Sequence, residues 1–111
     1  MGIFEFLESK NIEPDEYLLI ARRAAKKHGY DSDLLHLSDK AKFKLMYDGI
    51  YFGANLYNDY IIYSILYRQG KFTLEYINNR RKAYLARSEA IEGAWKNNKL
   101  SKNNLARNIL W

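Results

Sequence analysis

The sequence predicts an α+β fold, a mostly helical small domain in which one β-hairpin over about residues 42–54 packs against several helices. Two runs of alternating residues flank Asp48-Gly49, a dipeptide that suits a two-residue turn because both positions need positive φ. On either side of this segment, apolar residues recur at helical spacing. Residues 1–111, 48% of them hydrophobic and none of them cysteine, are expected to form a single domain without disulfides.

The turn sets the register of the hairpin. Tyr47 should face Ile50, so that Leu45 lies opposite Phe52 on the apolar face of the ribbon. The other face, which we expect to be solvated or covered by a partner, carries Lys42, Lys44, Met46, Tyr51 and Gly53.

A short helix is expected at 3–9 and a longer one at 14–28. Pro14 suits the first turn of the longer helix, and Gly29 suits a left-handed residue just after its end. The small Ala21 and Ala25 favour close packing of this helix against the apolar face of the hairpin.

Capping residues predict three further helices. Asn58 or Asp59 would begin a helix at 59–68, Thr73 one at 74–92 and Ser101 one at 102–109. The chain then ends in apolar side chains that either close the domain's own core, which we favour, or insert into a partner. These side chains are Leu105, Ile109, Leu110 and Trp111.

The net charge of +5 is unevenly distributed. Residues 1–67 hold 8 Lys and Arg against 10 Asp and Glu, whereas residues 68–111 hold 10 against 3. A basic segment of this kind attracts nucleic acid, acidic protein surfaces or lipid headgroups, and it is also typical of a solvated face that keeps a small protein soluble.

Within this segment, an arginine-rich helix and a run of tyrosines are the candidate binding features. Arginine suits bidentate contacts to carboxylate or phosphate, and tyrosine rings either stack on a partner or edge the core. The candidate partner-binding residues are Arg80, Arg81, Lys82, Arg87, Tyr51, Tyr57, Tyr60 and Trp111.

Motifs for catalysis or cofactor binding do not stand out. His28 and His36 lack the spacing of zinc ligands, and the sequence has neither a phosphate-binding glycine loop nor a serine nucleophile elbow. The aspartates at 31–39 lack the ligand order of a calcium loop. We therefore expect no enzyme, cofactor or metal site. No window of the sequence approaches the roughly 20 apolar residues that a membrane span needs, so we expect no membrane span either.

Several short stretches, taken together in their order along the chain, carry a resemblance to known proteins. They are Phe4-Glu-Phe-Leu-Glu-Ser-Lys, Tyr17-Leu with Ala21 and Ala25, Lys27-His-Gly-Tyr-Asp, Leu37-Ser-Asp-Lys, residues 42–59 with Tyr-Asp-Gly and Phe52-Gly-Ala, Arg80-Arg-Lys, Ile91-Glu-Gly-Ala-Trp-Lys and residues 101–111. With these stretches the chain resembles a family of small uncharacterised proteins encoded by large double-stranded DNA viruses of algae and protists. The resemblance covers most of the chain, and it implies a viral origin without established catalytic residues.

The resemblance implies a virion structural component, such as a minor capsid protein, that binds other viral structural proteins. Such a protein would be found in the virion, and in the host cytoplasm during assembly. The alternative is a nucleic-acid-binding or genome-associated viral protein that uses the basic helix near residues 80–87.

Overall fold

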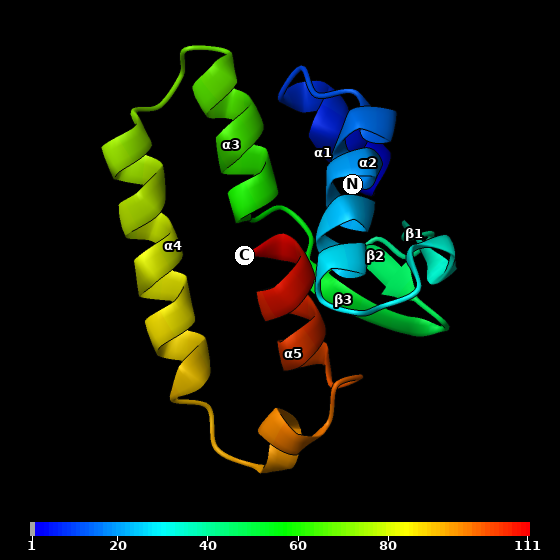
Figure 1. Cartoon of the computed structure of the whole chain (residues 1–111). Helices are drawn as coiled ribbons and strands as arrows, with labels where there is room; N and C mark the ends of the chain where they lie inside the picture. Colours follow the sequence, from blue (N-terminus) through cyan, green and yellow to red (C-terminus); the bar gives the residue numbers. More distant parts are fainter. Residues whose placement is uncertain (1) are drawn as a thin grey trace.

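The computed structural model describes residues 2–111 (Figure 1). The N-terminal elements are helices α1 (Ile3–Ser9) and α2 (Pro14–Lys27), a 3₁₀ turn (Ser32–Leu34) and strands β1 (Leu35–Leu37), β2 (Phe43–Tyr47) and β3 (Ile50–Ala54). The C-terminal elements are helices α3 (Tyr60–Arg68) and α4 (Leu74–Glu89), a 3₁₀ turn (Ala94–Asn97) and α5 (Lys102–Leu105), which a π-helical turn (Ala106–Leu110) continues. The predicted α+β class is confirmed.

The three strands form an antiparallel sheet in the order β1-β2-β3. The predicted hairpin register is confirmed, since Leu45 pairs with Phe52 and Tyr47 with Ile50. At the turn, Asp48 and Gly49 have φ of +47° and +84°, as the predicted turn requires. Strand β1 was not predicted, because three residues are too few to show a strand periodicity.

One prediction about the hairpin is wrong. Lys44 was placed on the solvated or partner-covered face, but only 2% of its surface is exposed. Its ammonium group is buried because it pairs with the carboxylate of Asp59, which follows β3 in the chain. A buried charge is stable in a protein when a partner of opposite charge compensates it.

The capping residues behave as expected. Asp59, Thr73 and Ser101 each accept a hydrogen bond from the main-chain N–H three residues later. Helix α4 ends at Glu89, three residues before the predicted end. Near this end, Asn103 and Arg107 of the C-terminal segment donate hydrogen bonds to the main-chain oxygens of Ser88 and Leu85.

The C-terminal segment, residues 102–110, lies at the centre of the fold. It runs between α4 on one side and α2 and the sheet on the other (Figure 1). Leu105, Ile109 and Leu110 are each at most 2% exposed, so the tail closes the domain's own core, as favoured above. Helix α2 packs against this segment, α3 and β1, rather than mainly against the hairpin as predicted.

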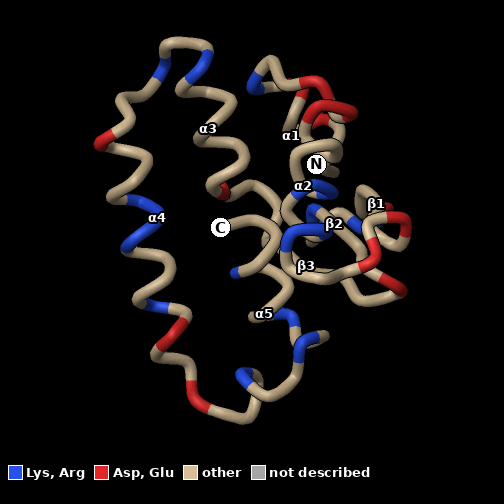
Figure 2. The backbone as a smooth tube through the Cα atoms, in the orientation of Figure 1, with Lys and Arg blue, Asp and Glu red and all other residues tan. Residues whose placement is uncertain are grey.

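The uneven distribution of charge along the chain is also seen in the folded molecule. Basic residues lie along α4 and in the segment that follows it, whereas acidic residues gather around α1, the start of α2 and the loops of the sheet (Figure 2).

Among residues 2–111, no helix combines the length and apolarity needed to cross a bilayer.

Candidate binding groove

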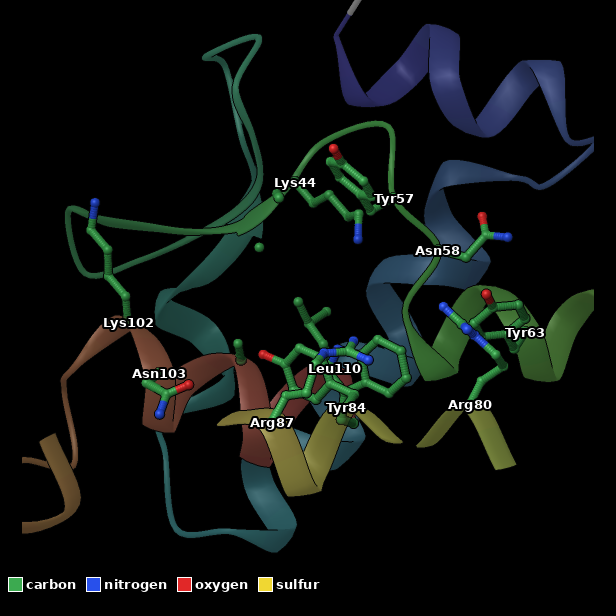
Figure 3. A pocket seen from close by; sticks show the side chains of 14 residues that line it. Lys44, Tyr57, Asn58, Tyr63, Arg80, Tyr84, Arg87, Lys102, Asn103 and Leu110 are labelled. Atoms are coloured by element: carbon green, nitrogen blue, oxygen red, sulfur yellow. The ribbon is translucent and has the colours of Figure 1, made fainter. Parts of the chain in front are cut away.

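A cavity of about 470 Å³ opens between α4, the segment that follows β3 and the C-terminal segment (Figure 3). We call it the basic groove, because none of the described residues that line it is Asp or Glu. Its cationic lining consists of Lys44, Arg80, Arg87 and Lys102. Its remaining lining consists of Tyr57, Tyr63, Tyr84 and Trp111, of Asn58 and Asn103, and of Gly53, Ala54, Ala106 and Leu110.

Helix α4 supplies one wall of the groove. Arg80, Tyr84 and Arg87 recur at steps of four and three, which brings them to the same side of the helix. Both arginines are exposed, and no carboxylate among residues 2–111 lies within ion-pair distance of either. Their positive charges are therefore available to a ligand.

The ring of Tyr84 stacks on Trp111, with ring centroids 4.2 Å apart and planes 6° from parallel. Burial raises the pKa of the Tyr84 phenol, and this effect outweighs the opposing fields of Arg107 and Arg87. The phenol is therefore neutral at physiological pH. It adds an uncharged, partly apolar surface between the two cations.

A buried ion pair supports the opposite wall. The Lys44 ammonium lies 3.1 Å from the Asp59 carboxylate, and the two side chains are 3% and 1% exposed. The same carboxylate accepts hydrogen bonds from the Tyr17 hydroxyl at 2.6 Å and from the Ile62 main-chain N–H at 2.9 Å. Burial and the negative Asp59 raise the pKa of Tyr17. Lys44 therefore joins the frame of the groove, with its charge already compensated.

Leu110 forms the floor of the groove and packs closely on β3. A Cβ atom added to Gly53 would lie 2.8 Å from a methyl group of Leu110, and Gly53 has φ of +78°. Glycine at this position thus allows the C-terminal segment to approach the strand. At the mouth of the groove, 71% of the surface of Tyr57 is exposed, and Lys102 extends to within 4.7 Å of the Phe43 ring centroid.

The structure brings together four of the eight predicted partner-binding residues. Arg80, Arg87, Tyr57 and Trp111 line the basic groove. Tyr57 comes from the segment after β3 and Trp111 from the C-terminal end, so only the fold brings them into one cavity with the arginines.

Arg81 and Tyr60 lie on the other side of Trp111, at a second cavity of about 290 Å³. The Arg81 guanidinium donates a hydrogen bond to the main-chain oxygen of Trp111 at 2.7 Å, and it lies 5.1 Å from the centre of the Tyr60 ring. The Tyr60 hydroxyl donates to Asn78. Both predicted residues are thus already engaged within the domain.

Lys82 and Tyr51 are not part of either cavity. Lys82 is exposed on α4. The Tyr51 hydroxyl donates to Asp39 at 2.6 Å, a hydrogen bond that raises the pKa of Tyr51, and Lys40 lies over its ring. The eight predicted residues therefore do not form one surface.

Sequence reasoning missed Lys44, Lys102 and Asn103 as groove residues. The alternation of the hairpin predicts Lys44 on the solvated or partner-covered face. Nothing in its local sequence shows that Asp59 compensates its charge. Lys102 and Asn103 follow the predicted cap Ser101, but the sequence does not show which helix they would face.

Within residues 2–111, no cluster of three or more His, Asp or Glu side chains could hold a metal ion. Two of the aspartates considered for calcium have other roles. Asp31 accepts a hydrogen bond from the main-chain N–H of Asp33, and Asp39 accepts one from Tyr51.

Comparison with protein-family models, with curated proteins and with solved structures gave no match for this chain.

Proposed function

We propose that the protein is a structural component of a virus particle, a minor capsid or other virion protein, that attaches to larger shell proteins through the basic groove. We further propose that it acts by binding and not as an enzyme. The viral assignment is supported by the sequence resemblance described above. The mode of attachment is supported by the groove.

One observation carries the proposal: two uncompensated arginines flank an apolar floor in an open cavity. Arg80 and Arg87 supply charge and directional donors, while the exposed Ala54 and the half-buried Trp111 offer apolar contacts above Leu110. This combination suits a partner segment that carries both acidic and apolar side chains. Protein surfaces have that composition, so a neighbouring protein is a suitable ligand.

The C-terminal residues do not extend out of the domain to insert into a partner. Leu105, Ile109 and Leu110 are buried in the domain, and Trp111 is half-buried between Tyr84 and Tyr63. Their removal would therefore affect folding before it affected assembly.

A second candidate function is binding to the viral genome, which the exposed ring of Tyr57, in the same groove as Arg80 and Arg87, favours. Three features weigh against it. Tyr84 and Trp111 stack on each other, which occupies ring faces that bases would need, Arg81 is held by Trp111, and Lys82 lies off the groove. We therefore rank this function second.

Mass spectrometry of purified particles of the source virus, separated into shell and genome fractions, tests the proposal. We expect the protein in the shell fraction. We also expect the variant R80Q/R87Q to be lost from particles, while R23Q/K82Q is retained. The second variant removes the same charge from exposed positions outside the groove.

Enrichment in the genome fraction would favour the second function. Absence of the protein from particles would contradict both functions. Retention of R80Q/R87Q at the wild-type level would show that the groove does not attach the protein to the shell.

A further inference from the structure

We infer that the basic groove binds an extended peptide segment of a partner protein in which one apolar residue lies between two acidic residues. This inference rests on the proposed function, because it names the part of the partner that the groove recognises. Its three elements follow from the charge, the spacing and the floor of the groove.

The charge of the groove requires an anionic ligand. Arg80 and Arg87 project from one wall and have no carboxylate partner among residues 2–111. The planar guanidinium group of arginine donates two parallel hydrogen bonds to a carboxylate. Two acidic side chains on the ligand would therefore satisfy both arginines.

The spacing of the arginines favours an extended ligand with acidic residues two positions apart. Arg80 and Arg87 are seven positions apart on the helix, which at a rise of 1.5 Å per residue is about 10 Å. Alternate side chains of an extended strand lie on one face, about 7 Å apart. The flexible arginine side chains are long enough to span the difference of about 3 Å.

The floor of the groove favours an apolar residue between the two acidic residues of the ligand. In an extended peptide this residue faces away from α4, toward the side of the groove where Ala54 is exposed above the buried Ala106 and Leu110. An apolar side chain would bury surface there. Tyr57, which is 71% exposed at the mouth of the groove, is placed to cover the bound segment (Figure 3).

A labelled synthetic peptide tests the inference. The probe is a fluorescein-labelled Gly-Ser-Glu-Phe-Glu-Ser-Gly peptide, and its binding to the full chain is followed by fluorescence anisotropy at moderate salt. We expect saturable binding that weakens about tenfold or more when both glutamates are replaced by glutamine, because both carboxylate–guanidinium pairs lose the charge that strengthens them. Replacement of the phenylalanine by alanine should also weaken binding.

Matched protein variants then locate the binding site. R80Q/R87Q should lose about tenfold or more in affinity for the peptide, whereas R23Q/K82Q, which loses the same charge outside the groove, should bind as the wild type does. Melting curves of both variants show whether each is folded. Equal losses in the two variants would show attraction by net charge alone and would overturn the inference.

A fluorescein-labelled oligothymidylate provides the competing ligand. We expect weak, strongly salt-dependent binding that the two double variants reduce equally. Tighter binding of the oligonucleotide than of the peptide, lost selectively in R80Q/R87Q, would identify the groove as a nucleic-acid site. If the peptide does not bind but R80Q/R87Q is still lost from the shell fraction, the inference fails and the proposed function stands.

Discussion

The carboxylate of Asp59 joins three parts of the molecule through single hydrogen bonds. It caps α3, accepts the Tyr17 hydroxyl of α2 and pairs with Lys44 of β2. The variant D59N keeps an oxygen for the cap but removes the charge that compensates Lys44. Breaking a buried pair by removing one partner costs about 3–5 kcal/mol, so we expect a loss of this size in the free energy of unfolding from urea titration.

The variant D39N is the control for this prediction. Asp39 also accepts a tyrosine hydroxyl, but its pair with Tyr51 lies at the surface, where water can replace the hydrogen bond. We expect a much smaller loss. If D59N were no less stable than D39N, the buried pair would not be a main support of the fold.

Gly53 is the second residue whose substitution isolates one contact. The variant G53A places a methyl group 2.8 Å from Leu110 in a backbone with φ of +78°. Gly70 has φ of +81° with open space around it, so G70A measures the backbone cost alone, about 1–2 kcal/mol. We expect G53A to be less stable than G70A in urea titration.

The contact with Leu110 accounts for that difference if a second substitution relieves it. Adding L110A should destabilise the G53A variant less than it destabilises the wild type, because it makes room for the new methyl group. Equal effects in the two backgrounds would show that the neighbouring segments shift freely, and that close approach is not required at this position.

At the scale of elements, Arg107 fastens the last turns of α4 to the C-terminal segment. Arg107 donates to the main-chain oxygen of Leu85 at 2.8 Å and to the Ser88 hydroxyl, and it lies 3.2 Å from Glu89. Ile77 and Ser88 are the buried positions along this helix, so apolar packing contributes little near its end. This helix carries Arg80 and Arg87, and its docking therefore keeps the groove in shape.

The variant R107A should loosen α4 without unfolding the sheet. We expect hydrogen exchange of the main-chain amides at 81–89 to accelerate about tenfold or more, because several charged hydrogen bonds are lost. The amides of β2 serve as the internal reference, and R23A is the control for loss of an exposed arginine. Faster exchange throughout the chain would show that Arg107 supports the whole domain instead.

At the scale of the whole molecule, the C-terminal segment determines whether the core closes. Leu105, Ile109 and Leu110 are fully or almost fully buried, and each such side chain contributes about 1.5–3 kcal/mol. Since a small domain has about 5–15 kcal/mol in total, deletion of residues 105–111 should abolish the cooperative melting transition.

Point variants provide a graded form of the same prediction. L105A removes a side chain with no exposed surface, and we expect a loss of about 2–5 kcal/mol. L100A removes the same atoms from a position that is 43% exposed, and it should cost much less. A truncated chain that melts cooperatively near the wild-type temperature would contradict the central position of this segment.

The features that the sequence alone determined are those with local physical causes. The Asp48-Gly49 turn and its register, the caps Thr73 and Ser101 and the start of α2 at Pro14 all follow from residues within a few positions of one another. Turn geometry, capping bonds and side-chain periodicity act over that range. Helical periodicity would also have separated Arg80 and Arg87 from Lys82 on α4.

The tertiary structure alone decided the features that join distant segments. Lys44 is buried because Asp59 meets it across 15 positions, and Trp111 reaches Tyr84 from the end of the chain. Strand β1 exists because β2 offers it hydrogen bonds, and α4 ends where the C-terminal segment binds its carbonyl oxygens. No local pattern encodes these pairings, because their free energy is gained only after the chain has brought the partners together.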